Sequence, residues 1–155
     1  MKKLLFTLLL SLLAINVYSQ RVDSTKSSIS KHHLGFHIGS TTGLGISYRY
    51  WHNRIGAQVT TMPFISKDNG NFYSLGLSFL YVLKDNKKAD LIGYIGNHFL
   101  SIDTKLNYNL GLGIGLKVDF FEVLDFSLQA GYGIYNLQDS PSSLPTGEIG
   151  LYYHL

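Results

Sequence analysis

The sequence predicts an all-β fold: an eight-stranded antiparallel up-and-down barrel that crosses a membrane with its strands. Apolar residues alternate with small or polar residues along eight successive stretches, and this period of two indicates strands with one apolar face. Charged residues make up 15% of the chain, against about 25% in soluble domains, and glycine occurs 16 times. Eight is also an even number, and it is the smallest that single-chain membrane barrels use.

The N-terminal residues have the pattern of a secretory signal. Two lysines precede an apolar stretch over residues 4–15, which is short for a membrane-spanning helix. Val17 and Ser19 are the small residues expected just before a signal-peptidase cut. We therefore expect residues 1–19 to be a signal peptide and residues 20–31, which are polar and show no periodicity, to be a flexible periplasmic lead-in.

Charge and cysteine content narrow the functional classes. Removing 19 residues from 155 leaves 136, and losing Lys2 and Lys3 leaves 11 Lys and Arg against 10 Asp and Glu. That length suits one domain, and the nearly neutral balance gives no support to nucleic-acid binding. Because the chain has no cysteine, no disulfide framework and no lipidated N-terminal cysteine is expected.

We expect the barrel to occupy residues 32–155. Its first three strands are expected over residues 32–40, 44–52 and 55–60. Their apolar faces alternate with small or polar residues and consist of Leu34, Phe36, Ile38, Leu44, Ile46, Tyr48, Tyr50, Ile55, Ala57 and Val59. Turn-forming residues 41–43 and Asn53 separate these strands.

The fourth and fifth strands are expected over residues 72–83 and 90–100, between a long loop over residues 63–71 and a charged turn over residues 84–89. The fourth strand has a regular apolar face that consists of Tyr73, Leu75, Leu77, Phe79, Tyr81 and Leu83. The fifth strand is ambiguous, because apolar residues lie on both faces: Ile92 and Tyr94 on one, Leu91, Ile95 and Phe99 on the other.

The sixth strand, over residues 106–118, has the clearest pattern of the chain. Every even position is apolar and every odd position is small or polar. A helix here would contain three interior glycines, each costing about 1 kcal/mol relative to alanine. At about 3.3 Å per residue the strand reaches about 43 Å, enough to cross an apolar band about 25 Å tall at the usual tilt. Strands over residues 123–135 and 147–155, separated by a proline-containing loop over residues 136–146, complete the barrel.

The composition of the second face favours a membrane barrel over a soluble lipocalin-like barrel. A solvated exterior would be about a quarter to a third Lys, Arg, Glu and Asp, but this face is mainly Gly, Ser, Asn and Gln. The other face carries rows of Leu, Ile, Phe and Tyr, which would aggregate in water but match a bilayer. Aromatic residues also fall near both strand ends, as membrane interfaces favour: Tyr50, Tyr81, Phe126 and Tyr153 near one rim, and Tyr73, Phe99, Tyr108 and Tyr132 near the other.

The C-terminal residues EIGLYYHL carry a further pattern: a polar residue, a glycine, an aromatic residue and a hydrophobic terminus, filled by Glu148, Gly150, Tyr153 and Leu155. With the signal peptide and the eight strands, this pattern resembles the small eight-stranded bacterial outer-membrane β-barrel family of the OmpA-barrel or OmpX type. Leu155 departs from the aromatic terminal residue that is more common in the family. The resemblance implies that these four residues form an assembly signal, with periplasmic chaperones and the barrel-assembly machinery as partners. We expect a monomer in outer-membrane lipid, with both termini in the periplasm.

An eight-stranded barrel is just wide enough to be filled by side chains, so we expect a structural or surface-interaction role rather than a general porin. The longest outer loops, over residues 63–71 and 136–146, are the expected contact surfaces. The many inward glycines leave an alternative open, in which the lumen holds a small apolar ligand.

No catalytic site, metal site or cofactor is expected. His33 and His37 share a face but lie about 13 Å apart along a strand, too far for one metal ion. A less favoured alternative is an outer-membrane hydrolase of lipid A or phospholipid, because the residue types of a Ser–His–acid set occur near the outer end of the fifth strand: His98, Ser101 and Asp103.

One ion pair is expected at the periplasmic end of the lumen. A hairpin centred on Phe121 would place Lys117 directly opposite Asp125, and both belong to the inward, small-polar face. Arg49 is expected to enter the same layer from across the barrel. Shielding by Arg49 and Tyr152 would make the pair strong, whereas the alternative is two independently solvated charges at the rim. We expect this set to plug the base of the lumen, so that the barrel carries no steady ion conductance.

Overall fold

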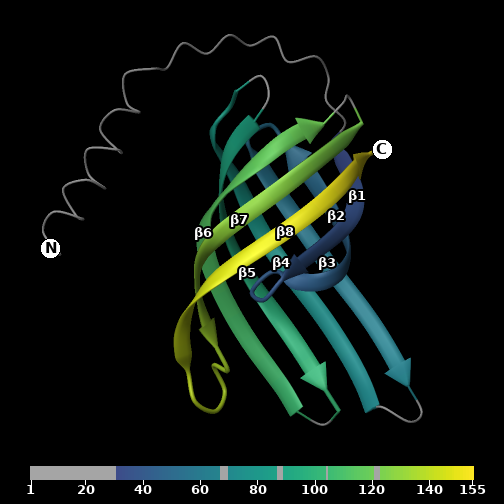
Figure 1. Ribbon diagram of the computed structural model, residues 1–155, viewed down its shortest axis with the longest axis vertical. Helices are drawn as coiled ribbons and strands as arrows, with labels where there is room; N and C mark the ends of the chain where they lie inside the picture. Colours follow the sequence, from purple (N-terminus) through teal and green to yellow (C-terminus); the bar gives the residue numbers. More distant parts are fainter. Residues whose placement is uncertain (1–30, 67–69, 87–88, 104, 121–122) are drawn as a thin grey trace, which may run out of the picture.

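The computed structural model describes residues 31–66, 70–86, 89–103, 105–120 and 123–155, in which eight antiparallel strands form a closed barrel (Figure 1). The strands are β1 (His32–Gly39), β2 (Gly43–His52), β3 (Ile55–Ser66), β4 (Gly70–Lys84), β5 (Ala89–Ile102), β6 (Lys105–Phe120), β7 (Leu124–Tyr135) and β8 (Ser142–His154). Each strand pairs with the next, and β1 pairs with β8. The predicted eight-stranded up-and-down barrel is therefore confirmed. The expected signal peptide, residues 1–19, lies outside the described residues.

No helix in the described part of the chain is long and apolar enough to cross a membrane.

The two faces of the barrel wall differ sharply in chemistry. On the outer face, large apolar side chains are widely exposed, such as Phe36 (68%), Leu112 (64%) and Tyr132 (65%). On the inner face, the largest fully buried side chains include Arg49 and Glu148. This is the inverse of a soluble protein, in which apolar side chains are buried and charged side chains face water.

The structure shows which side chains of β5 point into the lumen and which point outward, a question that the sequence left open. Ile92 and Tyr94 point into the lumen and are buried, whereas Ile95 and Phe99 are exposed on the outer face. The inward pair is apolar because it joins a small hydrophobic core inside the barrel, made by Trp51, Leu80, Val82, Ile92 and Tyr94.

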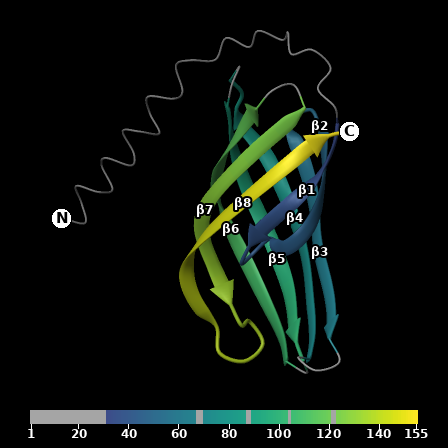
Figure 2. The ribbon, with the colours of Figure 1, turned by 45° about the vertical axis from the view of Figure 1, so that its right-hand side comes forward.

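β1 and β2 are shorter than the strands beside them. Their pairings end at Gly39 opposite Glu148 and at Ile46 opposite Thr61. Figures 1 and 2 show the β1–β2 hairpin ending well short of the point where β3 and β5 end and β4 and β6 begin. We call the end of the barrel that carries the start of β1 and the end of β8 the terminal end, and the opposite end the distal end. Toward the distal end, the wall consists of β3 to β8 alone.

β3, β4 and β8 are longer than expected, so the positions of the expected loops change. β3 and β4 extend through most of the loop expected over residues 63–71, and β8 extends into the loop expected over residues 136–146. Pro63 and Pro145 lie in these extensions and pair on one side only, with β4 and β7 respectively. Since proline cannot donate a ladder hydrogen bond, it is tolerated at a sheet edge. The prolines here mark strand edges left unpaired by the short β1–β2 hairpin. The loop expected over residues 63–71 is therefore mostly strand, and the loop expected over residues 136–146 is limited to residues 136–141.

Candidate functional site

The turn between β1 and β2, residues 40–42, lies inside the barrel, and we call it the lumen turn. Thr41 and Thr42 are 0% and 1% exposed, although they occupy a hairpin tip, where side chains are usually solvated. Gly43 and Gly45, which follow this tip at the start of β2, adopt positive φ values of 98° and 126°, which favour glycine. The lumen turn therefore fills the cross-section of the barrel.

Glycines on four strands make room for the lumen turn. A Cβ added at Gly76 of β4 would lie 1.9 Å from the Thr42 carbonyl oxygen, and one at Gly96 of β5 would lie 2.6 Å from Thr42 Cγ2. On the other side, a Cβ at Gly111 of β6 would lie 2.1 Å from Thr41 Oγ1, and one at Gly133 of β7 would lie 2.6 Å from Thr41 Cγ2. These four glycines, which are among the inward glycines that suggested space for an apolar ligand, are thus in contact with the chain's own turn.

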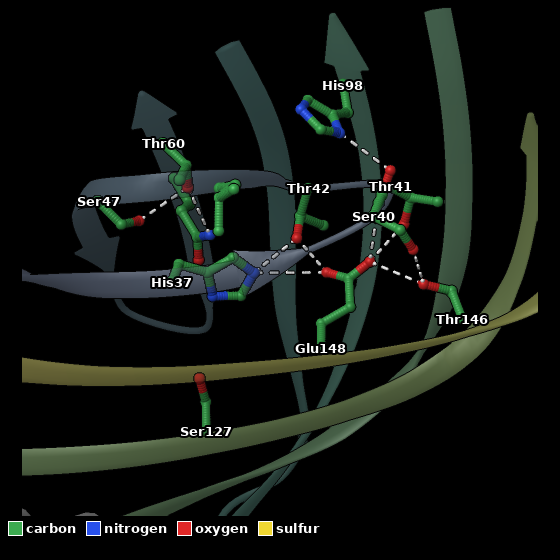
Figure 3. Close-up of polar contacts among 12 residues, drawn as sticks. His37, Ser40, Thr41, Thr42, Ser47, Thr60, His98, Ser127, Thr146 and Glu148 are labelled. Atoms are coloured by element: carbon green, nitrogen blue, oxygen red, sulfur yellow. Dashed lines mark hydrogen bonds and ion pairs between the residues drawn. The ribbon is translucent and has the colours of Figure 1, made fainter. Parts of the chain in front are cut away.

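Glu148 of β8 holds the tip of the lumen turn. The hydroxyls of Thr41 and Thr42 each donate to its carboxylate, and the Thr41 backbone N–H donates to Oε1 at 3.3 Å. The Thr146 hydroxyl donates to the same oxygen at 3.3 Å, and His37 Nε2 lies 3.5 Å from Oε2 (Figure 3). Five groups from four residues therefore surround one carboxylate that is 2% exposed.

Ser40 ties the lumen turn to the opposite wall. Its carbonyl oxygen accepts a hydrogen bond from His98 Nδ1 at 3.0 Å (Figure 3). It also accepts one from Asn109 Nδ2 at 3.2 Å. Its hydroxyl lies 2.8 Å from the Tyr135 hydroxyl and 2.7 Å from the Thr146 hydroxyl. The lumen turn is thereby bonded to β5, β6, β7 and β8, so it is fixed from several sides.

A second polar layer lies on the terminal side of the lumen turn and is organised by Arg49. Its Nε and Nη2 donate to Gln58 Oε1 at 3.0 and 2.8 Å, and Nη2 also donates to Ser127 Oγ at 3.3 Å. The guanidinium carbon lies 3.9 Å from the centre of the Tyr152 ring, a cation–π contact. The Tyr152 hydroxyl in turn bonds His37 Nδ1 at 3.1 Å, which connects this layer to the lumen turn.

The expected pairing of Lys117 with Asp125 is wrong. The β6–β7 register places Lys117 opposite Ser127 and Asp119 opposite Asp125, so the hairpin is centred one residue later than expected. Both side chains point inward, but Lys117 Nζ contacts Asp90 at 3.2 Å and Asp119 at 2.9 Å.

Asp125 lies among three other basic side chains. Arg49 Nη1 is 3.7 Å from Oδ1, while His33 Nδ1 and His154 Nε2 are 2.5 and 3.2 Å from Oδ2. Of the expected ion-pair residues, the structure thus brings Arg49 and Asp125 together and separates Lys117 from them. The two histidines could not be assigned from the sequence because their strands meet only when β1 and β8 close the barrel.

The four residues of the C-terminal pattern divide between the two faces. Glu148 and Gly150 face the lumen, where Gly150 lies against Tyr152 and His37. Tyr153 and Leu155 are 51% and 62% exposed.

His98, Ser101 and Asp103 are not brought together. Ser101 lies three residues from His98 and so on the opposite face of β5, and Asp103 is exposed in the turn that follows. The hydroxyl of Ser74 on β4 takes that place instead, with Oγ 2.9 Å from His98 Nε2. The β4–β5 register pairs His98 with Gly76, which puts Ser74 one inward position away.

Comparison with known proteins gives likeness of fold only. No protein-family model matches the sequence, and no curated protein matches it. The crystal structure of the N-terminal β-barrel domain of Pseudomonas aeruginosa OprF matches with a TM-score of 0.55 and 12% identity, over 79% of this chain and 93% of that one. The crystal structure of Ail, the attachment invasion locus protein of Yersinia pestis, matches with a TM-score of 0.37 and 19% identity, over 79% and 92%. The first match shows that this chain has the fold of the small outer-membrane β-barrels.

Proposed function

We propose that this protein is an integral outer-membrane barrel that conducts no ions and has a structural or surface-interaction role. The outer face supports the membrane location, since exposed Leu, Ile, Phe and Tyr side chains occur on all eight strands. A continuous apolar exterior of this kind would aggregate in water and matches the hydrocarbon of a bilayer. The polar, hydrogen-bonded interior supports the same assignment, because membrane barrels alternate apolar outward residues with polar inward ones.

The lumen turn is the observation that carries the proposed role. A channel needs a continuous polar passage, but here residues 40–42 occupy the lumen and are bonded to four strands. The Arg49 layer adds a second obstruction on the terminal side. A barrel closed at two levels has no route for steady ion flow, so a surface-interaction role would use its outer wall and its distal end.

Planar-bilayer recording tests the proposed role. The purified barrel is expected to insert without steady conductance. Glu148→Ala removes the carboxylate that holds Thr41 and Thr42, so transient openings are expected. Asp139→Ala is the matched control, because Asp139 is exposed in the β7–β8 connection and its substitution should leave the barrel closed. A stable open channel in the wild-type protein would contradict the proposal.

A second candidate function is acyl-ester hydrolysis, which the contact between Ser74 and His98 favours. The Ser40 carbonyl oxygen can only accept, so His98 Nδ1 is the donor in that bond, and in a neutral imidazole Nε2 is then the acceptor. The Ser74 hydroxyl therefore donates to Nε2, which is the arrangement in which a histidine acts as general base on a serine. The Leu44 backbone N–H also donates to Ser74 Oγ at 2.9 Å.

In this candidate reaction, Ser74 Oγ would attack the ester carbonyl while His98 takes its proton. The alcohol would leave with that proton, and water would then release the acid from the serine. A fluorophosphonate probe, which labels activated serines, tests the assignment. Labelling that is lost in Ser74→Ala and His98→Gln but kept in Ser101→Ala would support it. A wild-type protein that takes up no label excludes a reactive Ser74.

A further inference from the structure

Three side chains from three strands converge at the terminal end of the lumen. His33 comes from β1, Asp125 from β7 and His154 from β8, and their nearest ligand atoms all lie within 4.8 Å of one another. The Cα register pairs His33 with His154 across the seam where the barrel closes, and their ring centroids are 4.2 Å apart. These three residues, which we call the seam cluster, are far apart in sequence and meet only in the closed barrel.

The seam cluster is both preorganised and reachable. His33 and Asp125 are each 0% exposed, so their side chains are held by packing, whereas His154 is partly exposed at the rim. Asp125 Oδ2 lies 2.5 Å from His33 Nδ1 and 3.2 Å from His154 Nε2. Its other oxygen, Oδ1, is buried and has no hydrogen-bond partner among the described residues. Such a buried, incompletely satisfied carboxylate is unusual in a folded protein.

We propose that the seam cluster binds a divalent transition-metal ion of the Zn²⁺ class. Two imidazole nitrogens and one carboxylate oxygen form a ligand set that these ions favour, with a fourth position left for water. Ligand atoms around a tetrahedral Zn²⁺ lie about 3.3 Å apart, given bonds of about 2.0–2.2 Å. The present separations, from 2.5 Å to at most 4.8 Å, bracket that value, so small side-chain rotations suffice.

Arg49 also faces the Asp125 carboxylate, in addition to the two histidines, and its position is compatible with the site. Its Nη1 approaches Oδ1 at 3.7 Å, whereas both histidines lie on the Oδ2 side. The guanidinium is held away by its bonds to Gln58 and by the Tyr152 ring. Arg49 thus approaches the Asp125 oxygen that does not face the histidines and orients the carboxylate, as outer-shell partners of metal-bound carboxylates do.

A bound ion would connect the first strand to the last two strands. β1 and β8 close the barrel through seven Cα pairs, fewer than any other neighbouring strands except β2 and β3, which also have seven. Because the ligands come from β1, β7 and β8, metal binding would stabilise the closed barrel by mass action. This inference is independent of the proposed non-conducting role and of membrane location.

Titration of the full mature barrel, folded in detergent and without a histidine tag, tests the site with Zn²⁺ as the probe. One Zn²⁺ per chain is expected, with affinity reduced at least about 10-fold by His33→Gln and by His154→Gln. His32→Gln and His52→Gln are matched controls, because these histidines are exposed at the same end of the barrel and should leave the affinity unchanged. Co²⁺ added to the wild-type protein should give the visible absorption bands of a low-symmetry nitrogen–oxygen site, which requires no substitution.

Three results would overturn the proposal. The first is no saturable Zn²⁺ binding by the wild-type barrel. The second is a loss of affinity in His32→Gln or His52→Gln as large as in His154→Gln, which would indicate adventitious binding at the surface. The third is unchanged affinity in His154→Gln, a variant expected to fold because its residue lies partly exposed at the rim. A rise in the temperature at which the barrel unfolds, seen with Zn²⁺ in the wild type and absent in His154→Gln, would support the connection across the seam.

Discussion

Substitution of Gly111 by alanine measures how closely the lumen turn is packed. The three heavy atoms nearest to an added Cβ are all in the Thr41 side chain: Oγ1 at 2.1 Å, Cβ at 2.5 Å and Cγ2 at 2.8 Å. Without such contacts, replacing a strand glycine by alanine stabilises a protein by about 0.4–1 kcal/mol, because the unfolded chain loses freedom. With them, overpacking costs about 1–3 kcal/mol, so Gly111→Ala should lower the free energy of unfolding.

Urea unfolding followed by the fluorescence of Trp51, the single tryptophan, provides the assay. Gly147→Ala is the matched control, because an added Cβ there meets nothing within 4 Å. Thr41→Gly removes all three contacting atoms, so Gly111→Ala should cost less in that background, with a coupling energy of about 1–3 kcal/mol. If Gly111→Ala were as harmless as Gly147→Ala, the lumen turn would not lie where the structure places it.

Two further predictions concern the charged groups on the terminal side of the lumen. Lys117→Met leaves Asp90 without its buried ion-pair partner, and such a loss costs about 3–5 kcal/mol. We expect about 3 kcal/mol, the lower end of this range, because the Asn86 backbone N–H still donates to Asp90. Exposed Lys105→Met should have little effect, and equal unfolding curves for the two variants would refute the burial argument. Arg49→Lys keeps the charge but loses the paired bonds to Gln58 and the planar contact with Tyr152, so a loss of about 1–3 kcal/mol is expected in the same urea assay. An unchanged midpoint would show that charge alone is needed.

The alternation of residues along the strands was enough to predict the barrel and, for most strand residues, whether the side chain points inward or outward. It worked because most inward positions in this narrow barrel are small or polar and most outward positions are apolar, so the pattern has period two along most strands. β5 was ambiguous because Ile92 and Tyr94 are apolar residues that face inward, where they pack with Trp51 and Leu80. Periodicity cannot separate an apolar residue facing a small inner core from one facing lipid.

The contents of the lumen could not be predicted in the same way. The Lys117–Asp125 pairing depended on the register of one hairpin, and a shift of one residue in its centre gave both side chains different partners. The lumen turn was missed because Thr41 and Thr42 are ordinary turn residues whose inward position depends on glycines in four other strands. Likewise, Ser74 and His98 belong to different strands and meet only through their register.

The central claim, that residues 40–42 lie inside the barrel, has a direct test by cross-linking. The chain has no native cysteine, so Thr41→Cys with Gly111→Cys introduces the only two thiols. With the present backbone, their Cβ atoms would lie 2.5 Å apart, about 1.3 Å closer than in a typical disulfide, so a small shift would allow the bond to form. Two residues at this distance cannot lie on opposite sides of the barrel wall. Under mild oxidation, this pair is expected to form an intramolecular disulfide that mass spectrometry detects, whereas Thr41→Cys with Gly147→Cys should remain reduced. Two free, reagent-accessible thiols at positions 41 and 111 would contradict a turn that fills the lumen.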